Sequence, residues 1–231
     1  MKLGEIIEFI DEEIPKSLAL ESDEIGFKKD YDLAQRITSI KIFMDLLPED
    51  DAGENTLIIT HHPPSFTPKT PTYTIHSNWD IMDGGANEAL ADTLNLEVIA
   101  YFDSDTKIGR ICKANQSFIE LKNNILKNFK NVRVVNNLND EKSVKDVGII
   151  SGFGLKNPDY VTLAKTRNLD VLISGDLTLE TAVLGKKLGM TLIDLTHHDS
   201  EVPGLYALAD ILKELDIDVE VIDKNPMEVI K

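Results

Sequence analysis

The chain has 231 residues, 42% of them hydrophobic, so it can bury a substantial core as one large domain or two small lobes. Asp and Glu number 40 against 24 Lys and Arg, and the resulting formal charge of −16 disfavours binding to duplex DNA or RNA. No apolar run reaches the about 18 residues of a membrane span. The acidic, amphipathic segment Met1–Ile14 does not resemble a secretory signal. We therefore expect a cytoplasmic protein with no membrane partner.

Hydrophobic periodicity predicts helices and strands that alternate along the chain. In chain order they are helix 2–14, strands 39–47 and 56–60, helix 85–95, strand 96–102, a helix from residue 117, strands 132–135 and 147–150, helix 158–167, strand 171–173, helix 177–188, strand 191–195, helix 202–215 and strand 219–222. Ser117 and Glu120 have the spacing of a capping box. The β-branched, nearly continuous apolar strands predict an α/β protein with a mainly parallel or mixed sheet.

The polar stretch 136–145 is the best candidate for a boundary between lobes, which would then span approximately 1–135 and 146–231. Similar apolar strands precede His61-His62 and His197-His198. This similarity is either a coincidence or an indication of two related lobes that face each other.

The single cysteine, Cys112, excludes an intramolecular disulfide and any zinc site built from several thiolates. It lies in a strand-like run with no histidine nearby in the sequence. We interpret it as a small core residue rather than a catalytic thiol.

The histidines carry the strongest functional signal. There are only five, and they are His61, His62, His76, His197 and His198. Four of them form adjacent pairs that directly follow predicted strands, and the fifth lies four residues before an aspartate. In α/β sheets, binding sites collect beyond the carboxyl ends of strands. The pattern therefore predicts a metal site.

The spacing suggests two metal ions. The side chains of His61 and His62 diverge on an extended backbone and serve two adjacent ions more easily than one. His197 and Glu201 are four residues apart and share one face of a helical turn, as do His76 and Asp80. The metal ligands that we select are His61, His62, Asp80, His197 and Glu201, with Glu201 as the bridge between the ions.

These five ligands leave coordination positions for water or substrate, which suits catalysis better than a closed structural site. Mixed histidine and carboxylate ligation is compatible with Zn, Fe, Mn, Co or Ni. His76 is either a ligand or a substrate-facing proton donor, and we favour the proton donor. His198 is interpreted as a neighbour of the site.

Two glycine-containing turns are weaker candidates. Ser151–Gly154 follows a predicted strand and resembles an anion-binding turn, but it lacks the third glycine of a dinucleotide fingerprint. A plain strand-to-helix turn is the simpler interpretation, and a resting place for a substrate phosphate is the alternative. Ser174–Asp176 is a second loop at a strand end.

Several stretches together carry a family resemblance, and they are Ser22–Gly26, Ile59–Phe66, His76–Asp80, Gly85–Ala91, Ile108–Arg110, Leu172–Asp176 and Leu192–Asp194, followed by His197 and Glu201. Through them the chain resembles the GTP cyclohydrolase 1 type 2 homologues, also called Nif-three-like proteins. The resemblance implies a two-lobed α/β fold of mixed sheets flanked by helices, as one family-wide unit over 1–231. It also implies a dinuclear metal site in the cleft between the lobes and a toroidal homohexamer, a trimer of dimers. The family's metal ligands fall on the same five residues.

This sequence departs from the family pattern at four places. They are Ser22 in place of a tryptophan, the short segment Pro48–Asn55 in place of a helix, Thr196 in place of a glycine, and Glu180 in place of a histidine. The last change puts any catalytic role of that position in doubt.

The leading functional hypothesis is a metal-dependent hydrolase that acts on a nucleotide or related heterocycle through a metal-bound hydroxide. The family name suggests a GTP cyclohydrolase, and a phosphoesterase is a related option at the same two ions. The alternative is a non-enzymatic metal-binding or regulatory scaffold. Its partners are then further copies of the chain, whereas the enzyme also binds a small-molecule substrate.

Overall fold

The computed structural model describes residues 1–227, and their contacts divide the chain into two compact units. Unit 1 comprises Met1–Gly85 and the residues from Leu205 onward, and unit 2 is Ala86–Gly204. The boundary at residue 204 falls inside helix α7, His197–Leu212. No helix within residues 1–227 combines the length and the apolar composition needed to cross a bilayer.

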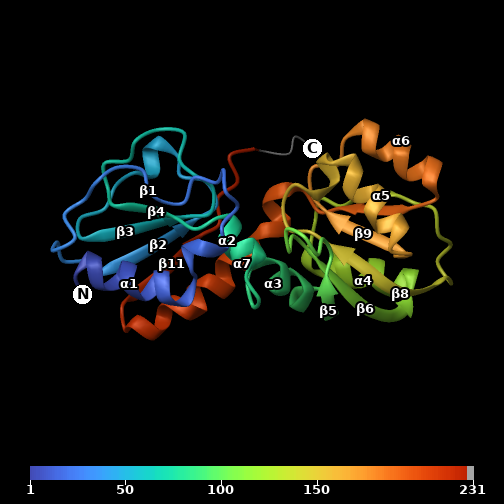
Figure 1. Cartoon of the computed structure of the whole chain (residues 1–231), viewed down its shortest axis with the longest axis horizontal. Helices are drawn as coiled ribbons and strands as arrows, with labels where there is room; N and C mark the ends of the chain where they lie inside the picture. The colour runs from blue at the N-terminus through green and yellow to red at the C-terminus, as the bar shows by residue number, and fades with distance from the viewer. Residues whose placement is uncertain (228–231) are drawn as a thin grey trace. The chain divides into compact units, whose positions relative to one another are not determined.

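Unit 1 is built on a five-stranded mixed sheet with the order β1-β4-β3-β2-β11 (Figure 1). Its strands are β1 (Gly26–Phe27), β2 (Ser39–Phe43), β3 (Thr56–Thr60), β4 (Thr72–Thr74) and β11 (Asp218–Ile222). All neighbours are parallel except β1 and β4. The helical elements are α1 (Leu3–Glu13), α2 (Ser77–Ile81), the later part of α7, and the 3-10 turns at Lys16–Leu18, Pro48–Asp50 and Lys213–Leu215.

Strand β3 is central to this sheet, and all five of its residues are buried. That explains its nearly continuous apolar sequence, because a parallel strand covered on both faces has no polar side. Helix α1 buries one stripe, Leu3, Ile6, Ile7 and Ile10, at the spacing that the sequence predicts.

Three parallel strands of unit 1 end level with one another. Phe43 of β2 pairs with Thr60 of β3, and Thr60 pairs with Thr74 of β4. The residues that follow these ends therefore meet at one edge of the sheet, and they include His61-His62 and His76.

Unit 2 is built on a six-stranded mixed sheet with the order β5-β6-β8-β9-β10-β7 (Figure 1). Its strands are β5 (Glu97–Tyr101), β6 (Arg110–Ser117), β7 (Arg133–Val135), β8 (Ser143–Ile149), β9 (Val171–Ser174) and β10 (Thr191–Asp194). Its helices are α3 (Ala86–Thr93), α4 (Phe118–Asn128), α5 (Pro158–Thr166), α6 (Leu179–Leu188) and the start of α7, with a 3-10 turn at Gly154–Lys156. Strands β8, β9 and β10 are parallel, and they also end at one edge.

Helices α3 and α4 pack on the sheet of unit 2 through a shared apolar core. The buried cluster joins their apolar stripes to alternate residues of the strands, such as Val171 and Ile173 of β9. On the other face, the Leu192 side chain of β10 packs against Gly185 of α6. Helix α4 begins with the expected capping box. Ser117 Oγ accepts a hydrogen bond from the Glu120 N–H, and Glu120 Oε2 accepts one from the Ser117 N–H.

The mixed α/β class with two sheets flanked by helices is therefore confirmed. The two units differ from the expected lobes 1–135 and 146–231, because strands on both sides of 136–145 belong to one sheet. Strand β8 begins inside this stretch, at Ser143. Short strands β1 and β4, helix α2 and most of strand β6 are additional to the predicted elements. Helix α7 begins at His197 rather than at residue 202, because Thr196 Oγ1 accepts the Asp199 N–H and starts the helix earlier.

Cys112 is expected to be chemically inert in the folded chain. Its side chain is fully buried in the core of unit 2. Burial, followed by the nearby Glu88 carboxylate, raises the pKa of the thiol to about 12, so thiolate is scarce at neutral pH. An aromatic disulfide reagent such as Ellman's should label no thiol in the native protein and one thiol per chain after unfolding in urea. Rapid labelling of the native protein would contradict the core assignment.

Candidate metal centre

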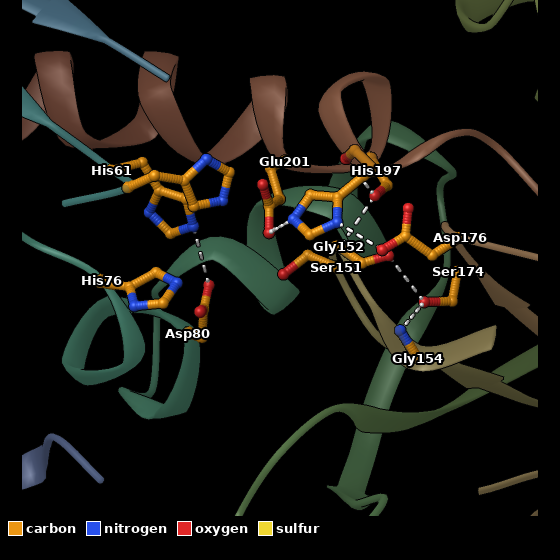
Figure 2. A network of polar contacts seen from close by, with 12 residues as sticks. His61, His76, Asp80, Ser151, Gly152, Gly154, Ser174, Asp176, His197 and Glu201 are labelled. Atoms are coloured by element: carbon orange, nitrogen blue, oxygen red, sulfur yellow. Dashed lines mark hydrogen bonds and ion pairs between the residues drawn. The ribbon is translucent and has the colours of Figure 1, made fainter. Parts of the chain in front are cut away.

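The first group of candidate ligands lies at the strand ends of unit 1. His61 follows β3 and is 3% exposed, and its Nδ1 lies 3.1 Å from the Ile75 carbonyl oxygen. Its Nε2 lies 3.7 Å from Oδ1 of Asp80, which faces it from helix α2 (Figure 2). His62 is held by Asp45, whose Oδ1 is 3.0 Å from His62 Nδ1. His61, His62 and Asp80 therefore form one half-site.

His76 belongs to the same group. Its ring centroid lies 5.1 Å from that of His61 and 5.5 Å from that of His62. One ring nitrogen from each of these three histidines lies within 4.8 Å of the other two. The Nδ1 atom of His76 is 2.7 Å from Oδ1 of Asp23. Burial raises the pKa of Asp23, but hydrogen bonds from Ser77 and His76 outweigh it and leave the pKa below its ordinary value.

The second group lies at the strand ends of unit 2. His197 is the first residue of α7, and its ring lies between two carboxylates (Figure 2). Its Nδ1 is 2.8 Å from Oδ2 of Asp176, and its Nε2 is 3.2 Å from Oε1 of Glu201. Glu201 is one helical turn further along and is 3% exposed. Burial lowers the pKa of His197, but Glu201 and then Asp176 outweigh it and raise the pKa to about 9. The second half-site is therefore His197 and Glu201.

Gly152 makes room for the Glu201 carboxylate. Its φ is +78°, and a Cβ atom at this position would lie 2.1 Å from Glu201 Oε1 and 3.2 Å from His197 Nε2. The Glu201 carboxylate therefore packs directly against the backbone of residue 152, and only glycine leaves room for this contact.

The turn Ser151–Gly154 is a packing turn rather than an anion cradle. The Ser151 N–H donates to Asn87 Oδ1, the Gly152 N–H to Ser200 Oγ and the Gly154 N–H to Ser174 Oγ, at 2.8–2.9 Å. Three backbone donors that a phosphate would need are therefore already engaged within unit 2, which supports the simpler interpretation.

Two residues beside His197 have left-handed backbone conformations. Asp176 has φ +61° and Thr196 has φ +70°. The second is unusual, because a β-branched side chain strains this conformation by roughly 1–3 kcal/mol. Glycine would have no such strain at this position. The Thr196 N–H donates to Asp194 Oδ1, and its hydroxyl caps α7, so the residue sets the start of the helix that carries His197.

His61, His62, His76 and His197 share one hydrogen-bonding arrangement. Each has an oxygen acceptor at Nδ1, and these acceptors are Ile75 O for His61, Asp45 for His62, Asp23 for His76 and Asp176 for His197. When the ring is neutral, an acceptor at Nδ1 fixes the tautomer and leaves the lone pair on Nε2. The donor chemistry therefore fits first-row divalent metals in both half-sites.

The carboxylates that orient the histidines are not among the sequence-predicted site residues. Asp45 and Asp176 lie two residues beyond the ends of β2 and β9, so the strand-end rule that selects the histidines also applies to them. Asp23 gives no such signal, because its loop is far from His76 in the sequence. Of the other candidates, His198 is buried beside His197, and Glu180 is exposed in the first turn of α6.

A pocket adjoins the half-site of unit 1. It has a volume of about 350 Å³, and its walls are Asp23–Lys28, Pro63, Pro64 and Thr74. Lys28 spans its rim and donates from Nζ to the Pro64 carbonyl oxygen at 2.5 Å. Because Asp23 also holds His76, the pocket and this half-site share a wall.

Two mixed α/β units, each with histidine and carboxylate side chains at its strand ends, define a protein whose donor groups suit transition metals. The chain belongs to the Duf34/NIF3 (NGG1p interacting factor 3) family, whose model matches residues 1–227.

Similar proteins cover nearly the whole chain. A "GTP cyclohydrolase 1 type 2 homolog" of Methanothermobacter thermautotrophicus is 36% identical over 96% of this chain and 93% of its own length. A protein of the same name from Methanocaldococcus jannaschii is 30% identical over 96% of this chain and 98% of its own length. Among solved structures, reduced HcgD from Methanocaldococcus jannaschii superposes with a TM-score of 0.82 and 29% identity, covering 97% of this chain and 98% of that one.

Proposed function

We propose that the chain binds two divalent metal ions through His61, His62, Asp80, His197 and Glu201. The observation that carries this proposal is the acceptor at Nδ1 of each of these histidines, which leaves Nε2 as the donor for a metal. Glu201, with two carboxylate oxygens, is the bridge.

We further propose that the chain is a metal-dependent hydrolase for a nucleotide or related heterocycle. The name shared by its relatives supports this substrate class. Two ions bound in this way polarise a substrate oxygen and make water more acidic. The pocket beside His76 has the size of a small-molecule site, and Lys28 at its rim supplies a positive charge for an anionic group of the substrate.

The chain's own residues then have distinct tasks. Asp45 and Asp176 hold the rings of His62 and His197 in the orientation that ligation needs. The proton that His197 carries at neutral pH must leave when a metal binds at Nε2, so binding to this half-site releases a proton. A cytoplasmic location and assembly into a homohexamer complete the proposal.

Metal loading followed by a substrate screen tests this function. The chelated protein is reloaded in turn with Zn, Mn, Fe, Co and Ni, its metal content is measured by elemental analysis, and hydrolysis of a panel of nucleotides is followed. We expect two ions per chain, and we expect Glu201→Gln to reduce turnover by at least about 100-fold, as is typical when a metal-bridging group is lost. The matched control is Glu214→Gln, which makes the same change at an exposed position.

The possible outcomes separate the competing functions. Fewer than two ions per chain would contradict the dinuclear site. Two ions without turnover of any nucleotide would contradict the hydrolase and favour the non-enzymatic metal-binding scaffold.

A further inference from the structure

We propose that His61, His62 and His76 form a three-histidine metal site contained within unit 1, in which His76 is a ligand and Asp23 is its positioning residue. This inference rests on the proposed metal binding and deepens it. It assigns to His76 a role other than the proton donor favoured by the sequence, and it gives unit 1 enough ligands to hold one of the two ions by itself.

The distances among the three histidines fit one ion. Their nearest ring nitrogens all lie within 4.8 Å of one another. Two ligand atoms of a tetrahedral ion with bonds of about 2.0–2.1 Å are roughly 3.4 Å apart. Small side-chain rotations are therefore enough to bring the three nitrogens onto a single ion. Asp80 Oδ1, 3.7 Å from His61 Nε2, is placed as the fourth donor.

Asp23 fixes the chemical form in which His76 is presented. Its Oδ1 lies 2.7 Å from His76 Nδ1, and its Oδ2 accepts the Ser77 N–H at 2.9 Å. When His76 donates from Nδ1 to this carboxylate, the neutral ring has its lone pair on Nε2. A lone pair binds a metal, whereas a proton donor would need a proton there.

The loop that carries Asp23 is held in place by the segment that carries His76. Its backbone is tied to α2 by a bond from the Leu20 N–H to Ser77 Oγ at 3.0 Å and by a turn from the Asp23 N–H to the Leu20 carbonyl oxygen. Asp23 and His76 are therefore positioned together, as a carboxylate–histidine pair that supports a metal ligand must be. All of these residues belong to unit 1. The site should accordingly bind an ion without help from His197 and Glu201.

Cobalt binding to a background that lacks the unit 2 ligands tests this inference. In the full chain carrying His197→Ala and Glu201→Gln, we expect one Co²⁺ per chain by elemental analysis and a visible absorption spectrum typical of nitrogen-rich coordination. Adding His76→Gln should weaken Co²⁺ binding by at least 10-fold, measured by calorimetry. Adding Asp23→Asn should weaken it about 10-fold, in the range found for groups that support a metal ligand. Asp30→Asn, at an exposed position nearby, is the matched control.

Paramagnetic proton NMR gives a readout that does not depend on affinity or activity. The Co²⁺-loaded background should show three exchangeable, strongly shifted imidazole N–H signals, one for each histidine, and the His76→Gln form should show two. Circular dichroism confirms that each variant is folded before loading.

The outcomes distinguish this inference from the proposed function. If the unchanged chain binds no metal, the proposed function fails and the inference with it. If the unchanged chain binds two ions but the background binds none, the independent site in unit 1 is overturned while the dinuclear proposal stands. If the background binds one ion with two imidazole N–H signals, and His76→Gln changes neither affinity nor spectrum, His76 is not a ligand.

Discussion

Gly152→Ala is expected to displace the Glu201 carboxylate and to weaken metal binding at the half-site of unit 2. The added methyl group would lie 2.1 Å from Glu201 Oε1, less than any allowed contact, and the backbone at φ +78° is itself unfavourable for alanine. The backbone conformation alone should lower the free energy of unfolding by roughly 1–3 kcal/mol. Displacing the carboxylate should also weaken metal binding at His197 by about 10- to 100-fold. Urea unfolding and calorimetric metal titration measure the two effects.

Gly189→Ala is the matched control for this prediction. Gly189 ends helix α6 in the same unit with φ +64°, and a Cβ atom there meets nothing within 4 Å. The control should show the loss of stability that comes from a left-handed backbone and leave metal binding unchanged. If Gly152→Ala binds metal as tightly as Gly189→Ala does, the close approach of Glu201 to Gly152 is not required for the site.

Arg110→Met is expected to destabilise unit 2 without altering its metal ligands. The guanidinium is 1% exposed, is paired with Glu88, and donates to the carbonyl oxygens of Lys107 and Gly109. Methionine fills much of the space but removes the cation and its hydrogen bonds. Loss of one partner from a largely buried ion pair costs about 3–5 kcal/mol, because the Glu88 carboxylate, which is only 19% exposed, then lacks its cation. Urea unfolding followed by circular dichroism measures this loss.

Lys113→Met provides the comparison on the same strand. Lys113 forms an ion pair of 2.5 Å with Asp146, but both side chains are about one third exposed. Such a pair is worth roughly 0–1 kcal/mol, so this variant should unfold close to the unchanged chain. The double variant Arg110→Met with Glu88→Gln should recover part of the lost stability. Equal effects of Arg110→Met and Lys113→Met would show that burial does not set the strength of these pairs.

Most of the fold follows from local sequence patterns. The sequence predicts strand β3 with the bounds that the structure has, because Thr56–Thr60 is an unbroken apolar and β-branched run between polar segments. It predicts helix α4 from its cap and its apolar stripe. Strands β1 and β4 have only two and three residues, which is too short for a periodic signal. The unit boundary was not predictable either, because unit 1 is formed by segments from both ends of the chain.

The candidate ligands were accessible to sequence reasoning because they are rare residue types at strand ends. His61, His62 and His197 stand out in a chain with only five histidines. The aspartates that hold them do not stand out, since Asp and Glu together number 40. Asp23 in particular reaches His76 across more than 50 residues of sequence. Only the tertiary structure pairs them.

The stretches that resemble the family contain residues with different roles. His61 and His62 lie at a candidate metal site, whereas Arg110 is buried in an ion pair that supports the loop before β6. The departure at Thr196 is also informative, because the chain keeps the left-handed conformation without the glycine that usually adopts it. This left-handed backbone therefore holds a β-branched residue whose hydroxyl caps α7.

The division of α7 and the late position of β11 have a consequence for how the protein is made. The chain of unit 1 is interrupted by the whole of unit 2, and β2 gains its last neighbour only when β11 has been synthesised. Until then, β2 is an open edge with unpaired backbone groups, which favours association with other chains. Unit 2 is continuous and can fold first during translation. The N-terminal strands are thus synthesised first, but their sheet is complete only after β11 has been made. Their folding is slow because it depends on contacts between residues far apart in the sequence.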